Sequence, residues 1–246
     1  YKDGRIMANK LTAENIEAAV QHLENIQSGV TPILDGVDRG VEDSKEERID
    51  LGDQSFDNHQ LNKSLEVYPL IPPNDPRLLM QIAPFLDDTL EHLGFQDRDT
   101  LCKVMYGNMV KYGGLGLSAN QIGLPYRMFV MGGHPQVEEG KVRYVFNPII
   151  NDVSPESVML KEGCLSFPFL FLSIKRPKWV NVRYTNENNE EIEETLHGMS
   201  ARIFQHENEH MNGYIFTELV SKLKLDRAEK SKLKMIKEIQ KKQNTP

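Results

Sequence analysis

Residues 206–210 read HENEH, an HExxH sequence within a stretch whose apolar residues have helical spacing. Residues four apart lie on one face of an α-helix, so the imidazoles of His206 and His210 can bind the same metal ion. Glu207 lies beside them as a candidate proton carrier. The sequence therefore predicts a metal-binding helix at the centre of the fold.

A catalytic metal site of this kind needs a third protein ligand next to an open position. The metzincin extension of HExxH has a histidine where this chain has Phe216, so that ligand is missing. Other zinc peptidases use a downstream carboxylate, for which Glu218 and Glu229 are candidates without a recognisable supporting motif. Cys164 is a different candidate, because the segment EGCLSFP at residues 162–168 places it between a glycine and a loop-forming stretch. The residues alone leave both kinds of ligand open.

A glycine-rich segment, GLGLSANQ at residues 114–121, has the spacing of a dinucleotide-binding loop. That loop must follow a strand and open a helix, whereas this segment follows a predicted helix and leads into a predicted strand. We therefore interpret it as a loop whose backbone approaches an extended peptide, with the Gln121 amide as a hydrogen-bond donor.

The periodicity of the remaining chain predicts an α+β fold. Apolar residues have helical spacing around residues 101–109, at 199–212 and in the basic segment 219–239. Between the first two helices lie short runs rich in β-branched and aromatic residues. These runs are 127–131, 144–150, 157–160, 169–174, 179–185 and 192–196. We expect mixed or antiparallel sheets packed around the HExxH helix, followed by a C-terminal helix.

Residues 1–64 differ in composition from the rest of the chain, with 7 Lys+Arg against 13 Asp+Glu. Their periodicity predicts one short helix over residues 12–27 and otherwise poor order. The composition becomes typical of a folded domain at about Leu65. We therefore predict an acidic N-terminal extension at 1–64 and a folded domain at 65–246.

Composition limits the classes of function. The formal net charge of -7 argues against a general nucleic-acid binder, because phosphate contacts need a basic surface. No stretch approaches the ~18 consecutive apolar residues of a membrane helix, and the first residues lack the order of a secretory signal. The 2 cysteines are too few for a disulfide framework. We therefore expect a cytoplasmic protein with no membrane and no specific nucleic-acid partner.

Three of these segments, in this order, resemble the signature segments of the peptide deformylases. That family is marked by GxGLAAxQ, EGCLS and QHExDH. This chain has GLGLSANQ at 114–121, EGCLS at 162–166 and QHENEH at 205–210. The resemblance covers roughly residues 65–240 and implies that the folded domain is a metallohydrolase.

The resemblance implies that Cys164, His206 and His210 bind one divalent metal ion. In this family the ion is typically Fe²⁺, and Zn²⁺, Ni²⁺ or Co²⁺ can replace it. The implied reaction is hydrolysis of the N-formyl group from the formyl-methionine of newly synthesised polypeptides, which releases formate. Glu207 would take the proton of the attacking water and pass it to the leaving amine.

The same resemblance implies the roles of five further residues. The side chain of Gln121 and the backbone N–H of Leu165 would stabilise the oxyanion. Leu115, Gly116 and Gly163 would line a cleft in which the peptide pairs as an added strand. The implied partners are nascent N-formyl-methionyl peptides, and the basic final helix suggests a contact with the ribosome.

The chain departs from the family pattern at two positions, and the sequence leaves two alternative functions open. Ser118 stands where alanine is usual, and Glu209 stands where aspartate is usual. One alternative is a metallopeptidase of another HExxH family, in which Cys164 would not bind the metal. The other is a non-catalytic binding module, against which the retention of Glu207, Gln121 and the ligands argues.

Overall fold

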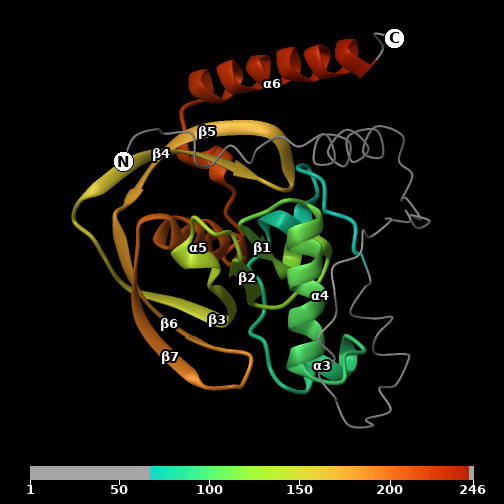
Figure 1. Ribbon diagram of the computed structural model, residues 1–246, viewed down its shortest axis with the longest axis vertical. Helices are drawn as coiled ribbons and strands as arrows, with labels where there is room; N and C mark the ends of the chain where they lie inside the picture. The colour runs from blue at the N-terminus through green and yellow to red at the C-terminus, as the bar shows by residue number, and fades with distance from the viewer. Residues whose placement is uncertain (1–66, 244–246) are drawn as a thin grey trace, which may run out of the picture.

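The computed structural model describes residues 67–243, which form two antiparallel sheets and three long helices (Figure 1). The predicted α+β fold class is confirmed. The acidic extension at 1–64, with its predicted helix over 12–27, lies outside the described residues. Among the residues that are described, no helix is both long enough and apolar enough to span a membrane.

The larger sheet has the strand order β1-β2-β3-β6-β7, and each neighbouring pair is antiparallel. Four of its strands correspond to predicted runs: β6 shows the alternation of a strand with one buried face, whereas β2 is buried along its whole length. The third strand is longer than the predicted run 144–150, since its last residues are polar or exposed. The strands are β1 (Gly116–Ser118), β2 (Met128–Gly132), β3 (Val142–Val153), β6 (Trp179–Thr185) and β7 (Glu191–His197).

Strand β1 corrects the expectation of a loop at residues 114–121. Gly116 lies opposite Met131 of β2, so residues 116–118 form an edge strand of the sheet. A strand of three residues is too short to show alternation in the sequence. Residues 116–118 are recognised as a strand only because they pair with β2. Alternation along β1 directs Leu117 into the core beneath α4, whereas Gly116 and Ser118 face α5.

The smaller sheet is a hairpin of β4 (Ser157–Cys164) and β5 (Phe167–Pro177). A two-residue turn, Leu165 and Ser166, joins the two strands. Both strands are longer than the predicted runs 157–160 and 169–174, so the stretch expected to form a loop after Cys164 is a tight turn followed by a strand. The Cys164 thiol therefore lies at the tip of this hairpin.

Helix α5 (Gly198–Met211) carries the HExxH sequence and lies between the two sheets (Figure 1). It contacts four strands of the larger sheet and strand β5 of the hairpin. Ile203, Phe204 and Met211 are buried in the core that it shares with the larger sheet. The ring of Phe204 packs edge-on against Phe129, with centroids 5.1 Å apart. The predicted central helix is confirmed.

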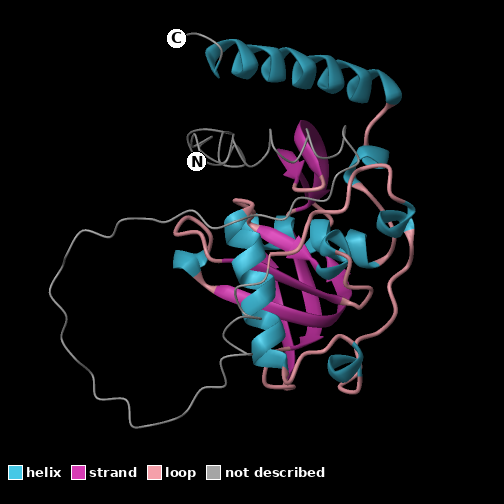
Figure 2. Cartoon of the chain, turned by 90° about the vertical axis from the view of Figure 1, so that its right-hand side faces the viewer, coloured by secondary structure: helices cyan, strands magenta, loops and turns pink. Residues whose placement is uncertain are grey.

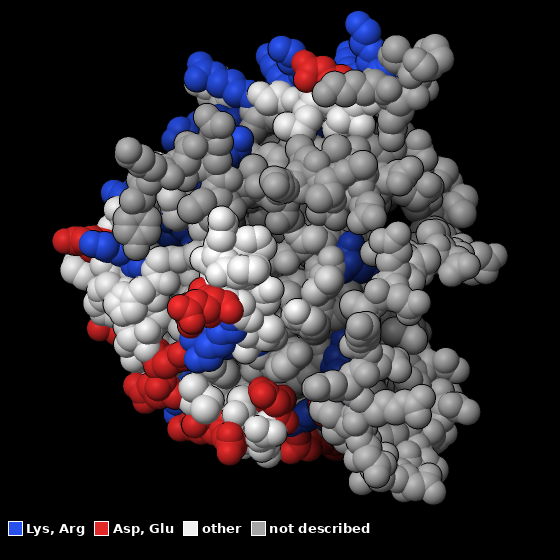
Figure 3. Space-filling view, viewed as in Figure 1, with Lys and Arg blue, Asp and Glu red and all other residues white. Residues whose placement is uncertain are grey.

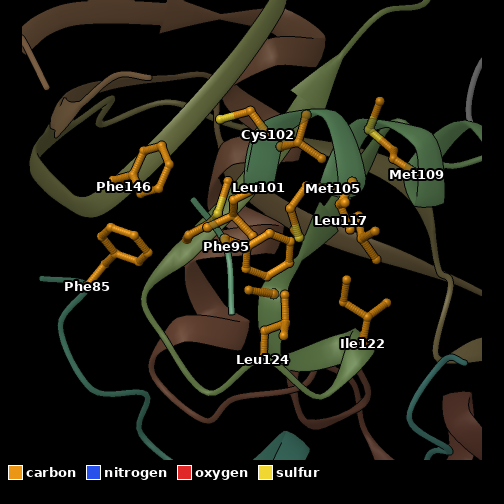
Figure 4. Close-up of a cluster of buried hydrophobic side chains, with 14 of the residues drawn as sticks. Phe85, Phe95, Leu101, Cys102, Met105, Met109, Leu117, Ile122, Leu124 and Phe146 are labelled. Atoms are coloured by element: carbon orange, nitrogen blue, oxygen red, sulfur yellow. The ribbon is translucent and has the colours of Figure 1, made fainter. Parts of the chain in front are cut away.

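A second core lies between helix α4 (Arg98–Lys111) and the β1–β2 edge of the larger sheet (Figure 4). The helix begins at Asp97, whose side chain accepts a hydrogen bond from Thr100 N–H at 2.8 Å. Leu101 and Met105 of α4 lie near Leu117 of β1 (Figure 4). This core holds β1 from the face opposite α5 and so fixes where β1 meets the HExxH helix.

Helix α6 (Lys222–Gln243) confirms the predicted C-terminal helix and lies outside the β4–β5 hairpin (Figures 1 and 2). Its first turns contact β5, with Leu225 and Ala228 packed against the core beneath the hairpin. The shorter helical segments are η1 (Pro76–Leu79), α3 (Thr89–His92), η2 (Ala119–Ile122), η3 (Glu138–Gly140) and η4 (Phe216–Leu219).

Candidate metal and catalytic centre

The fold brings Cys164 of β4 together with His206 and His210 of α5. Their potential ligand atoms all lie within 4.8 Å of one another, and Cys164 Sγ is 3.3 Å from His210 Nε2. Among residues 67–243 this is the cluster of potential ligands that could hold a metal ion. The alternative carboxylates, Glu218 in η4 and Glu229 in α6, do not belong to it.

His206 is oriented by a buried carboxylate. Its Nδ1 lies 3.1 Å from Oε2 of Glu162, which is fully buried. Burial raises the pKa of Glu162, but hydrogen bonds with His206 and Arg176 outweigh burial and hold that pKa well below its usual value. An ionised carboxylate only accepts hydrogen bonds, so Nδ1 of His206 carries a proton and Nε2 is the nitrogen that is left to bind a metal.

Two arginines hold Glu162 in place. Arg176 of β5 donates to both carboxylate oxygens, at 2.7 and 2.9 Å, and Arg202 of α5 donates to Oε1 at 2.7 Å. Arg176 also pairs with Glu209, the residue that replaces the usual aspartate. Sequence reasoning missed both arginines. Arg176 follows Lys175, Arg202 lies between Ala201 and Ile203, and neither setting gives a sign of a partner distant in the chain.

His210 is also prepared to act as a ligand. Burial lowers the pKa of His210 well below its usual value, so the ring is neutral and offers a lone pair. Its Nε2 is the nitrogen nearest the thiol of Cys164. One sulfur and two imidazole nitrogens form a donor set that suits Zn²⁺, Fe²⁺ and related divalent ions. The residues present therefore fit the metal that the family pattern implies.

The Glu207 carboxylate lies against strand β1. Its Oε2 accepts a hydrogen bond from Ser118 Oγ at 2.7 Å. A Cβ atom on Gly116 would lie only 2.5 Å from Oε1, so the absence of a side chain at Gly116 makes room for this carboxylate. Burial raises the pKa of Glu207, which favours the protonated form of this carboxyl group.

Gln121 lies in η2 with its amide directed at the hairpin tip. The N–H of Ser118 donates to Gln121 Oε1 at 2.9 Å, which fixes the orientation of the amide. The Nε2 group then points to Cys164 Sγ at 3.3 Å and to Ser166 Oγ at 3.2 Å. Leu165 lies between these two residues in the turn. The structure thus brings the two predicted oxyanion donors to the predicted ligands.

The predicted cleft residues lie on two strand edges that face the same centre. Gly116 is in edge strand β1, and Leu115 precedes it, half-buried beside the α5 core. Gly163 lies in β4, where a Cβ atom would come within 2.9 Å of the Phe171 ring. Each of the two glycines thus has a local packing reason as well.

Comparisons with known proteins agree with this geometry. The polypeptide deformylase family profile matches residues 73–226. The peptide deformylase of Thermotoga petrophila is 40% identical over 152 residues, which are 61% of this chain and 85% of that protein. The peptide deformylase of Wolbachia pipientis subsp. Culex pipiens is 38% identical over 175 residues, which are 68% of this chain and 94% of that protein.

Solved structures show the same relationship. The crystal structure of peptide deformylase from Thermotoga maritima has a TM-score of 0.56 and 35% identity, covering 63% of this chain and 99% of that chain. The peptide deformylase from Ehrlichia chaffeensis, in complex with actinonin, has a TM-score of 0.58 and 34% identity, covering 73% of this chain and 99% of that chain.

The matched residues span all three signature segments. The predicted enzyme class is therefore confirmed, and the reaction is removal of the N-formyl group from newly made polypeptides. Because the family profile matches residues 73–226, more than half of the sequence, this chain belongs to the peptide deformylase family.

Proposed function

We propose that deformylation takes place at the centre formed by Cys164, His206 and His210, with Glu207 as the proton carrier. The observation that carries this proposal is the convergence of the three ligand atoms within 4.8 Å, next to the buried Glu207 carboxylate. The three ligands would hold one divalent ion. Fe²⁺ is expected from the family, and the donor set also suits Zn²⁺, Ni²⁺ and Co²⁺.

When bound, the ion supplies Lewis acidity, which makes an attacking water easier to deprotonate. Glu207 accepts the proton of that water and later gives it to the leaving amine, which requires a carboxylate near the ligands but not among them. Its Oε2 is engaged by Ser118, so Oε1 is the oxygen that exchanges the proton. The cleaved bond is the amide between the formyl carbon and the methionine nitrogen, and the products are formate and a free amine.

Charge develops on the formyl oxygen as its carbon becomes tetrahedral. The Gln121 amide has its Nε2 fixed toward the hairpin tip, and the Leu165 N–H lies in the adjoining turn. Donors fixed in advance stabilise such an oxyanion without reorganisation. Both groups would therefore act in the transition state more than in substrate binding.

The peptide would bind between the edges of β1 and β4. In the described part of the chain, β1 pairs only with β2, and β4 pairs only with β5, so each strand has one unpaired edge. An extended peptide can add to such an edge through backbone hydrogen bonds. Leu115, Gly116 and Gly163 would supply those groups. Such pairing recognises the backbone of the peptide rather than its side chains. An enzyme that acts on many different nascent chains requires this kind of recognition.

The test is formate release from a formyl-methionyl peptide by protein purified anaerobically with Fe²⁺, compared with a Glu207→Ala variant. We expect the variant to retain its metal and to lose about 10²- to 10⁴-fold in kcat. Metal content is measured on both proteins. Parental activity in Glu207→Ala would overturn the role of Glu207, and no formate from the metal-loaded parent would overturn the assignment of the centre.

The ligand set has a separate test. Cys164→Ala should abolish metal binding, whereas Glu218→Gln should leave it unchanged, because Glu218 is not part of the cluster. The reverse result would favour a zinc peptidase with a carboxylate ligand. Metal content and hydrolysis of unformylated peptides, measured on both variants, distinguish the two arrangements.

We also propose that α6 contacts the ribosome and that the enzyme works in the cytoplasm, where its substrates are made. Figure 3 shows Lys and Arg side chains along α6 and acidic side chains gathered at the far end of the same face. Such a basic surface suits ribosomal RNA. Changing Lys230, Lys234 and Lys237 to Glu should weaken co-sedimentation with ribosomes, with unchanged activity on a short peptide. Unchanged co-sedimentation would dispose of this contact.

The domain division is likewise a proposal. We propose that the catalytic unit comprises residues 65–246 and that residues 1–64 are a separate extension. The family match begins at residue 73, which supports this division. A chain that begins at Leu65 should keep the kcat/KM of the full chain on a formyl-methionyl peptide, and a large loss would place part of the extension in the catalytic unit.

A further inference from the structure

We infer that Ser118 is a positioning residue for deformylation: its hydroxyl holds one oxygen of the Glu207 carboxylate and leaves the other oxygen to accept the proton. This inference rests on the proposed role of Glu207. Alanine, the usual residue of the family signature at this position, has no hydroxyl, so this contact adds to the family pattern.

The contact between the two side chains is short and buried. Ser118 Oγ lies 2.7 Å from Glu207 Oε2 and 3.2 Å from the backbone oxygen of Glu207. A hydroxyl has a single hydrogen to donate. The carboxylate oxygen is the stronger acceptor of the two, because it is closer and carries charge. Ser118 is 0% exposed and Glu207 is 4% exposed, so water competes little with this bond.

The two carboxylate oxygens have different neighbours. Oε2 is held by Ser118, whereas Oε1 lies beside Gly116, where a Cβ atom would be only 2.5 Å away. Among residues 67–243, Ser118 is the side chain that donates a hydrogen bond to this carboxylate. Oε1 is therefore the oxygen that is open to the proton of the attacking water.

The position of Ser118 follows from the strand that carries it. Residues 116 and 118 lie on the same face of β1, and that face packs against α5. Leu117, on the other face, is anchored in the α4 core. The hydroxyl is thus held by a strand fixed on both sides, and it restrains a glutamate that otherwise rotates about three bonds. Proton transfer depends steeply on such orientation.

The test compares Ser118→Ala with Ser118→Thr, which keeps the hydroxyl. Ser118→Ala should lower kcat about 10- to 100-fold, as expected for loss of a hydrogen bond to a charged group. KM and metal content should change by less than about twofold, because the hydroxyl contacts neither substrate nor ligands. Ser118→Thr should recover most of the lost kcat. The control is Ser200→Ala, which removes the hydroxyl of a different buried serine, located in α5. This variant should keep parental kinetics.

A second comparison shows whether Ser118 acts through Glu207. In a Glu207→Asp background the carboxylate is one methylene shorter and withdraws from the hydroxyl. Ser118→Ala should then change kcat by less than about twofold, as a coupled pair in a double-mutant cycle requires. An equal loss in both backgrounds, or a loss that follows the metal content, would overturn the inference.

The outcomes separate this inference from the proposed function. If Glu207→Ala loses activity while Ser118→Ala has parental kcat, the inference fails and the role of Glu207 stands. If Glu207→Ala keeps its activity, the role of Glu207 fails, and the inference fails with it. Thermal unfolding of each variant shows whether any loss of kcat reflects loss of the fold.

Discussion

Nδ1 of His206 lies 3.1 Å from Oε2 of Glu162, and this contact joins the candidate metal centre to a buried group of charges. Glu162 is in turn held by Arg176 and Arg202. A histidine ligand with its ring fixed in this way presents Nε2 without having to reorient. The geometry of the centre therefore depends on residues that touch neither substrate nor metal.

Replacing Glu162 with Gln tests this dependence. Metal affinity should fall about 10- to 100-fold, because His206 loses its charged acceptor. The free energy of unfolding should fall by about 3–5 kcal/mol, because two buried arginines lose their counter-charge. Chelator competition and denaturant unfolding measure the two effects. Glu156→Gln, which removes an exposed partner of Lys178, is the control. Parental metal affinity in Glu162→Gln would contradict the positioning of His206.

Gly116→Ala should displace the candidate proton carrier. The added Cβ atom would lie 2.5 Å from Glu207 Oε1 and 2.8 Å from Ile203 Cγ2, so the carboxylate must move. We expect kcat to fall about 100-fold or more, the lower end of what general acid–base catalysis contributes. Gly198→Ala also strains the chain, with φ +56, but has open space around it. Equal activity losses in the two variants would indicate damage to the fold rather than to Glu207.

Gln121→Ala should lower kcat more than it changes KM. An oxyanion donor is worth about 10²- to 10³-fold in kcat, since it acts on charge that develops only in the transition state. Steady-state kinetics on a formyl-methionyl peptide measure both constants. Gln136→Ala removes an exposed glutamine and serves as the control. A rise in KM at constant kcat would instead assign Gln121 to substrate binding.

Stability should depend on pH through Glu194, which lies away from the metal centre. Burial raises the pKa of Glu194, but hydrogen bonds from Arg143 and Tyr184 outweigh burial, and the net pKa is lowered. A carboxyl whose pKa is lower in the folded state stabilises the protein above its unfolded-state pKa and loses this effect as the pH falls. Glu194→Gln should therefore be less stable than the parent near neutral pH, and the difference should shrink below about pH 4.3.

Urea unfolding of both proteins across this pH range measures the difference. Glu193→Gln, on the same strand but with an exposed side chain, is the matched control. A stability difference between the parent and Glu194→Gln that stays constant with pH would show that the carboxylate is not the titrating group.

The site residues that could be predicted from the sequence are those whose roles follow from their spacing along the chain. His206 and His210 could be assigned to one helix face because they are four residues apart. Cys164 needed the family pattern, since its approach to the histidines depends on a hairpin that packs on a distant helix. The apolar strands were found for the same local reason, whereas β1 was taken for a loop because only its pairing with β2 makes it a strand.

The charged residues around the centre show what spacing cannot reveal. Arg202 lies between Ala201 and Ile203, and nothing local indicates that it binds Glu162 at a separation of 40 residues. Ser118 appeared only as a departure from the family pattern, and its contact with Glu207 depends on how β1 meets α5. Interactions between segments far apart in the chain are set by tertiary packing, which periodicity does not encode.

Two ion pairs link the hairpin to the histidine helix across the ligand set. Arg202 of the helix pairs with Glu162 of the hairpin, and Arg176 of the hairpin pairs with Glu209 of the helix. Both sides of the ligand set are therefore drawn together by the chain's own charges. Folding by itself brings the thiol close to the two imidazoles, so an arriving ion would meet donors that are already arranged.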